Sequence, residues 1–209
     1  GVLHGMLPDN LNCKYTFNTE FLQNLTAMVI FVLHLKYSKH MKALFDLITE
    51  EEKEILVDAI SQITVLIAGA DGKMQKEELE WAEKLTRIRS FSHHKSLQTF
   101  YETVGLDFHE RLHQLIDELP ASTQQRTEIL EAKLAHVEPI LQKLPIEFGS
   151  LLYHSFTSFA KHVAKSAGGF LGIGVISTNE SKLMKLSMLT PIIADVEDEE
   201  EADEHTEDN

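Results

Sequence analysis

Helical spacing dominates this chain of 209 residues, because apolar residues recur three and four positions apart over almost its whole length. Such spacing places apolar side chains on one face of an α-helix, whereas a half-buried strand needs them at every second position. No convincing alternating run occurs in the sequence. The pattern therefore predicts an all-α fold. With 43% hydrophobic residues, the chain can bury one substantial core, as in a single-domain helical bundle.

The expected helices lie near 18–35, 50–69, 75–89, 92–104, 108–118, 122–143, 146–166 and 178–190. Four of these starts carry a capping-box pair, in which Ser, Thr or Asp precedes Glu or Gln by three positions and both side chains bond to the first turn. The pairs are Thr49 with Glu52, Asp107 with Glu110, Ser122 with Gln125 and Ser177 with Glu180.

Changes in composition divide the chain into three predicted segments. Residues 1–40 form an extension with one apolar helix, residues 41–193 form the helical domain, and residues 194–209 form an acidic tail with too little apolar surface to order. The apolar run "LTAMVIFVLHL" at 25–35 is too short to span a bilayer, which favours a buried helix. A signal peptide is the competing interpretation, although no small-residue cleavage pattern follows the run.

The net charge of −14 is concentrated at one end, because residues 195–209 hold ten acids and no Lys or Arg. Neither this tail nor the rest of the chain shows the basic patch that follows a phosphate backbone, so direct nucleic-acid binding is not expected. A cation or a basic protein is the more natural partner. The single cysteine, Cys13, cannot form an internal disulfide, which fits a cytoplasmic protein.

The stretch "ADGKMQKEE", residues 70–78, contains the break between the helices predicted at 50–69 and 75–89, and it has two interpretations. Gly72 suits the left-handed conformation that ends a helix, and acidic residues in the first turn of the following helix interact favourably with the dipole of that helix. Neither feature requires a ligand. Alternatively, Asp71 and Glu78 share a hard cation such as Ca²⁺ or Mg²⁺, joined by Glu180 from a second glycine turn. Aligning Gly72 with Gly174 suggests that the bundle contains two pseudo-repeats.

Three ordered blocks carry a resemblance to a known family. They are "LITEEEKEILVDAISQITVLIAGADGKMQKEELEWAEKLTRIRSF", "RLHQLIDELPASTQQR" and "SAGGFLGIGVISTNESKLMKLSML". Over about residues 43–190 the chain is similar to the bacterial TerB-like family, named for tellurite resistance. The resemblance implies an all-helical bundle with a metal-linked role for acids at its turns, here Asp71, Glu78 and Glu180. This chain departs from the pattern at Ile173, which stands where Asp71 aligns.

Residues 109–113 read His-Glu-Arg-Leu-His, which matches the H-E-x-x-H pattern of zinc proteases. In that pattern His109 and His113 would bind zinc, and Glu110 would activate water. A charged Arg111 lies inside the motif and no third ligand is marked, although Glu131 is at a workable distance in sequence.

The function expected from these observations is a cytoplasmic, non-enzymatic TerB-like binding or stress-response module with a divalent cation or a protein as partner. One alternative is a pure protein-interaction module without metal, and the other is a zinc hydrolase that uses the H-E-x-x-H segment. The adjacent His93 and His94 point in different directions on any helix, so a chelating pair is not expected there.

Overall fold

The computed structural model describes residues 28, 45–72, 74, 76–166 and 178–194, and within these residues every regular element is a helix. The prediction of an all-α helical bundle is confirmed. The chain divides into two compact units, residues 1–36 and 37–209, and the helices below belong to the second. Among the helices of the described ranges, none has the length and apolar character needed to cross a membrane.

Helix α2 (Glu50–Ala68) is the centre of the second unit and packs against each of its other described helices. Its start is the capping box predicted from the sequence. The Glu52 amide donates to Thr49 Oγ1 at 3.2 Å, and the Thr49 amide donates to Glu52 Oε2 at 2.9 Å. From Leu56 onward, Asp58 is the one residue of α2 that is not buried. A helix that is apolar on nearly all sides can only be stable when other elements surround it.

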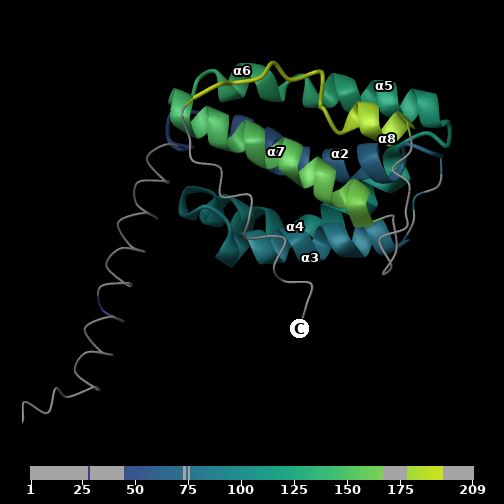
Figure 1. Cartoon of the computed structure of the whole chain (residues 1–209), viewed down its shortest axis with the longest axis horizontal. Helices are drawn as coiled ribbons and strands as arrows, with labels where there is room; N and C mark the ends of the chain where they lie inside the picture. The colour runs from purple at the N-terminus through teal and green to yellow at the C-terminus, as the bar shows by residue number, and fades with distance from the viewer. Residues whose placement is uncertain (1–27, 29–44, 73, 75, 167–177, 195–209) are drawn as a thin grey trace, which may run out of the picture. The chain divides into compact units, whose positions relative to one another are not determined.

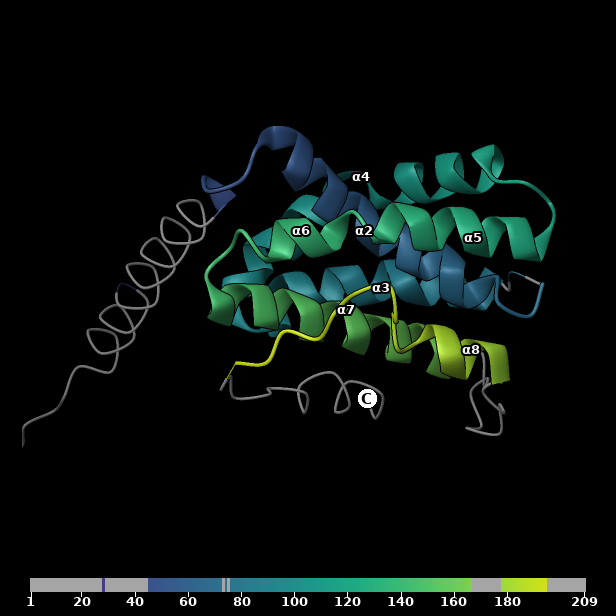
Figure 2. The ribbon, with the colours of Figure 1, turned by 90° about the horizontal axis from the view of Figure 1, so that it is seen from above.

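The other helices cover α2 from opposite sides. Figure 1 shows α5 and α6 on one side, α3 and α4 on the other, and α7 running across α2 between them. Figure 2 shows from above that α7 extends along the length of α3, against which it packs. The bounds are α3 (Lys76–Ser92), α4 (Lys95–Glu118), α5 (Thr123–Leu134), α6 (Val137–Leu141), α7 (Ile146–Ser166) and α8 (Thr178–Leu183).

Helix α4 spans both helices expected at 92–104 and 108–118, and the break expected between them is present as a kink. The helix continues through a kink at Asp107, whose φ of −139° and ψ of 19° are not helical. The Asp107 carboxylate pairs with Arg111 one turn later. Ser122 does precede α5 as its N-cap residue, but its side chain makes no capping hydrogen bond.

Two helix ends differ from the prediction. The helix expected at 122–143 breaks after Leu134, and α6 begins at Val137. Pro139 has no amide hydrogen and cannot donate to the carbonyl four residues earlier, which favours this break. Helix α8 ends at Leu183 instead of 190, because Leu186 adopts a left-handed φ of 43° with its side chain completely buried.

Several predictions fall outside the described ranges. They are the helix at 18–35, the second glycine turn with its pseudo-repeat, the Ser177 cap and the acidic tail. Within 18–35 only Met28 is described, and it is helical.

A buried polar cluster joins α3, α4 and α7. The Arg89 guanidinium is completely buried and donates to Tyr101 Oη at 3.0 Å, to the Ser155 carbonyl at 2.9 Å and to Ser158 Oγ at 3.0 Å. Tyr101 Oη and Ser155 Oγ are hydrogen bonded at 2.6 Å, and His93 Nε2 lies 3.1 Å from the same Oγ. Because each oxygen is removed from water, these bonds fix how the three helices dock.

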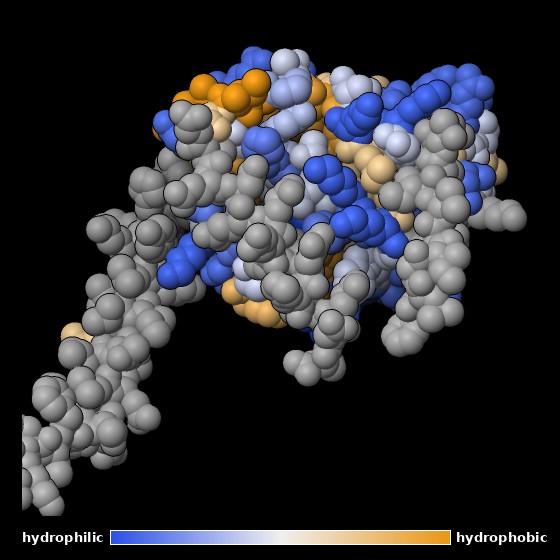
Figure 3. Space-filling model, in the orientation of Figure 1, coloured by the Kyte–Doolittle hydropathy of each residue, from blue (hydrophilic) through white to orange (hydrophobic). Residues whose placement is uncertain are grey.

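The surface that Figure 3 shows is mostly hydrophilic, with a smaller apolar area near α6. The large apolar side chains of the second unit that are exposed among the described residues come from different parts of the chain: Leu47, Phe91, Leu106, Ile129, Ile146 and Ile193. Exposed apolar residues that occur singly are normal on protein surfaces. The polar features of the second unit are therefore the better guide to function.

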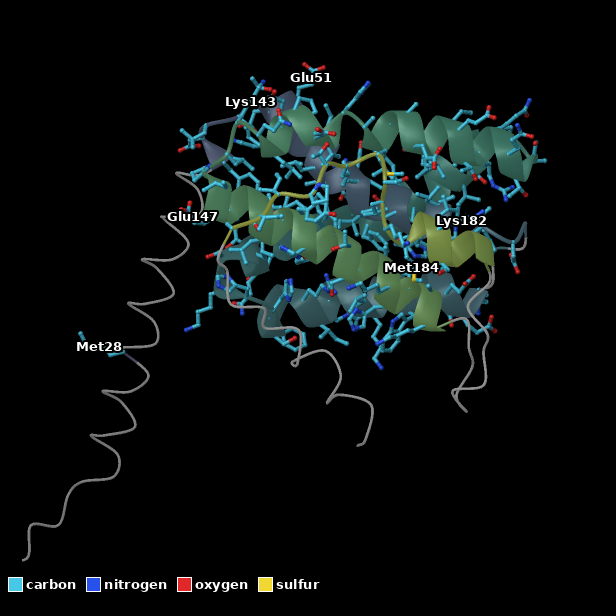
Figure 4. All side chains as sticks on the ribbon, turned by 45° about the horizontal axis from the view of Figure 1, so that its top comes forward. Met28, Glu51, Lys143, Glu147, Lys182 and Met184 are labelled. Carbon is cyan, nitrogen blue, oxygen red and sulfur yellow. The ribbon has the colours of Figure 1, made fainter. Side chains whose placement is uncertain are left out.

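The start of α2 provides a test by pH. Figure 4 shows Lys143 near Glu51 at the end of the bundle where α2 begins, and Lys143 bonds the neighbouring Glu52. Lys143, and next the Thr49 amide, hold the pKa of Glu52 below its ordinary value of 4.5. A lowered pKa stabilises the fold above the unfolded pKa, and this stabilisation is lost as the pH falls through the folded pKa. Glu52→Gln should therefore reduce the difference in unfolding free energy between pH 7 and pH 3.

Urea unfolding of both proteins at the two pH values measures this difference. Glu51→Gln is the control, since Glu51 is exposed and forms no ion pair with any described residue. Equal pH dependence in wild type and Glu52→Gln would contradict the assignment of Glu52.

Candidate functional site

A polar cleft of about 370 Å³ opens between α2, α4 and α5. Helix α2 supplies its floor, α4 one long wall, and α5 a single lysine. Its volume lies at the lower end of the range for small-molecule sites, but polar side chains dominate its lining, unlike most such sites. The lining residues are Asp58, Ser61, Gln62, Asp107, Glu110, Arg111, Gln114, Leu115, Glu118 and Lys133.

Arg111 holds one end of the cleft together through three carboxylates. Its Nη1 donates to Asp58 Oδ1 at 2.6 Å, and its Nη2 lies 2.7 Å from Glu54 Oε2. Its Nε lies 2.8 Å from Asp107 Oδ1, but the N–H does not point at that oxygen, so this contact is an ion pair and not a hydrogen bond. Asp107 first, and then Asp58 and Glu54, raise the pKa of Arg111, which remains charged.

The floor of the cleft contains two buried polar side chains whose oxygens have no hydrogen-bond partner in the described part of the chain. Ser61 is 2% exposed and Gln62 is 8% exposed, and the atoms concerned are Ser61 Oγ and Gln62 Oε1. A buried oxygen without a partner costs roughly 1–3 kcal/mol of stability. Native proteins rarely leave such groups unpaired, so each one indicates water or a ligand.

The outer part of the cleft carries more negative than positive charge. Glu110 and Glu118 are exposed at its edge, and Gln114 Nε2 donates to Glu118 Oε1 at 2.8 Å. Lys133 stands on the α5 side, where its side chain is exposed. Since Arg111 is already surrounded by carboxylates, the cleft as a whole attracts cations more than anions.

This cleft was not among the sites predicted from the sequence, although its residues leave a recognisable signal. Glu54 and Asp58 are four residues apart, and so are Asp107 and Arg111, which places each pair on one face of its helix. An aspartate inside a helix as apolar as α2 marks a point where that helix reaches a polar surface, and the Asp58 side chain is 44% exposed there. In the sequence, Arg111 stands out only as a charged residue inside the H-E-x-x-H pattern.

The acids predicted to bind a hard cation are positioned as follows. Asp71 is exposed in the turn after α2, where Gly72 has the expected left-handed φ of 88°. Glu78 is buried in the first turn of α3, with 1% of its surface exposed. Glu180 lies in α8, and its side chain is outside the described part. The cation site at Asp71, Glu78 and Glu180 stays a prediction.

The H-E-x-x-H segment lies on α4, and its two histidine rings are 4.4 Å apart. His109 is exposed and its Nδ1 lies 3.3 Å from Glu83 Oε2 of α3, while Glu110 faces the cleft. Within the described residues, no three His, Cys, Asp or Glu side chains are grouped so that they could hold a metal ion. Phe108 and Leu112 are buried, as expected for an amphipathic helix.

The adjacent histidines have separate structural roles. His93 contacts Ser155 in the buried cluster, whereas His94 is the N-cap of α4 and its Nδ1 accepts the Ser96 amide at 3.2 Å. The two rings therefore contact different partners. Ser155 is 2% exposed, so the hydroxyl beside His93 is closed to a substrate.

Comparison with protein-family models, curated proteins and solved structures finds no match for this chain. The similarity to the TerB-like family therefore stays a prediction from the residues. The function has to follow from the chemistry of the cleft.

Proposed function

We propose that this chain is a non-enzymatic binding module, as the TerB-like resemblance implies, and that the cleft between α2, α4 and α5 holds a small polar ligand. The observation that carries the proposal is the pair of buried oxygens on the floor, Ser61 Oγ and Gln62 Oε1. A ligand with hydrogen-bond donors would satisfy both and offset their desolvation. The volume of about 370 Å³ leaves room for such a molecule.

A binding role, and not catalysis, is supported by the state of the charged groups. Arg111 of α4 forms ion pairs with Glu54 and Asp58 of α2, and these pairs connect the two helices. Groups used in this way hold the walls of a site at a set separation, which is what a preformed binding site requires. The exposed His109, paired with Glu83, offers no comparable support for the zinc hydrolase.

An NMR titration of ¹⁵N-labelled protein tests the proposal with three probes of different charge: putrescine, succinate and glucose. We expect saturable shifts of the Ser61, Gln62 and Arg111 amides with one of these classes. Gln62→Leu keeps a side chain of similar size but removes the acceptor, and should weaken that response. Gln125→Leu, an exposed glutamine outside the cleft, is the matched control and should bind like wild type. If none of the probes gives a saturable shift in the cleft, the proposal is wrong.

A further inference from the structure

We infer that the cleft binds an organic cation, an ammonium or guanidinium group, and that Arg111 excludes divalent metal ions from it. This inference rests on the proposed function and names the chemical class of its ligand. It also identifies the residue that would set the selectivity of the site.

The charge of the lining favours a cation. Four carboxylates line the cleft, those of Asp58, Asp107, Glu110 and Glu118, against the two positive groups of Arg111 and Lys133. Glu54, the third partner of Arg111, adds a further negative charge beside it. A concave site with an excess of one sign raises the local concentration of ligands of the opposite sign.

The floor then distinguishes an organic cation from a simple ion. Gln62 Oε1 can only accept a hydrogen bond, and Ser61 Oγ can accept one as well. An ammonium has three N–H donors and a guanidinium has five, so one such group can satisfy the floor and still reach an edge carboxylate. Hydrogen bonds from charged donors are also about twice as strong as neutral ones.

The described residues contain no group of three acidic, histidine or cysteine side chains placed to hold a metal ion, and at the cleft three carboxylates are arranged around Arg111 instead. Three of its nitrogens lie 2.6–2.8 Å from three different carboxylates, Asp58, Glu54 and Asp107. Ca²⁺ needs six to eight oxygen ligands and Mg²⁺ needs near-octahedral geometry, and both would have to take these carboxylates from the arginine. A guanidinium does not lose its charge in proteins, so it repels the metal in addition to blocking it.

Isothermal titration of the full chain with agmatine tests the inference, and Ca²⁺ is the competitor. Agmatine carries an ammonium and a guanidinium, and N-acetyl-arginine-N-methylamide carries the same guanidinium on a peptide backbone. Binding of either supports the inference, and their relative affinities show whether the source is a free amine or an arginine side chain. We expect Gln62→Leu to weaken agmatine about tenfold or more. In wild type, Ca²⁺ should not displace agmatine.

Arg111→Gln tests the selectivity, because it leaves Asp58, Glu54 and Asp107 without their internal cation. Ca²⁺ should then compete with agmatine, with an affinity at least about tenfold above its affinity for wild type, since Ca²⁺ affinity rises with ligand charge. Circular dichroism checks that this variant folds. If it does not, Glu110→Gln at the exposed edge takes its place and should weaken agmatine, while Glu102→Gln, exposed on α4 outside the cleft, should not.

Each negative result has a separate meaning. Displacement of agmatine by Ca²⁺ in wild type overturns the role of Arg111. Binding of succinate in place of agmatine overturns the choice of a cation and leaves the proposed binding module standing. Absence of binding by all the probes overturns both.

Discussion

Arg89→Ala should lower the free energy of unfolding by roughly 3–5 kcal/mol, through a cavity and through lost hydrogen bonds. The arginine is completely buried, and its guanidinium donates to Tyr101, to Ser155 and to Ser158 across three helices. It also lies over the Tyr101 ring, 5.5 Å from the centroid. Alanine removes all of these contacts and leaves polar oxygens in a space that water does not reach.

Thermal unfolding followed by circular dichroism measures this loss, which corresponds to a melting temperature lower by roughly 6–20 °C for a chain of this size. Arg87→Ala is the matched control, because Arg87 lies two residues earlier on α3 with its side chain exposed. That variant should stay within about 0.5 kcal/mol of wild type. A similar small effect for Arg89→Ala would show that the cluster does not hold α3, α4 and α7 together.

Phe156→Ala should cost roughly 3–5 kcal/mol of stability, through lost apolar burial and the cavity that remains. Phe156 lies on α7 with no exposed surface, and its ring is 6.0 Å from that of Phe100 on α4. Helix α7 packs against α2, α3 and α4, so the cavity would open where several helices meet and where none can move alone to fill it.

The measurement is chemical unfolding in urea, in which the midpoint should fall while the slope stays constant if the variant unfolds as one unit. Phe91→Ala provides the comparison, since Phe91 is 65% exposed and its removal leaves no cavity. If both variants lose the same stability, the region around Phe156 is not the close-packed core that its burial indicates.

These two variants also separate stability from binding. Neither Arg89 nor Phe156 lines the cleft, so folded Arg89→Lys or Phe156→Leu protein should bind the probes as wild type does. Variants of Gln62 and Glu110 should instead bind the probes more weakly. Because Glu110 is exposed, its variant should keep a melting temperature close to that of wild type.

Local signals in the sequence were enough to determine several features of this protein. The apolar spacing indicates the helices, and the Thr49–Glu52 pair marks the start of α2 because both of its hydrogen bonds lie within one turn. Gly72 has the positive φ expected of it, since glycine takes that conformation without steric cost. Each of these features depends on residues only a few positions apart.

Only the tertiary structure decided where the last helix ends and which charges meet. Leu186 has a left-handed φ and a completely buried side chain, so its packing against other helices outweighs the local preference for a continuous helix. Asp58 and Arg111 are 53 residues apart, and nothing near either one specifies the other. Their contact exists because α2 and α4 dock side by side, and that docking depends on the shape of the whole core. For the same reason, the floor oxygens of Ser61 and Gln62 become a candidate binding site only after α4 and α5 enclose them.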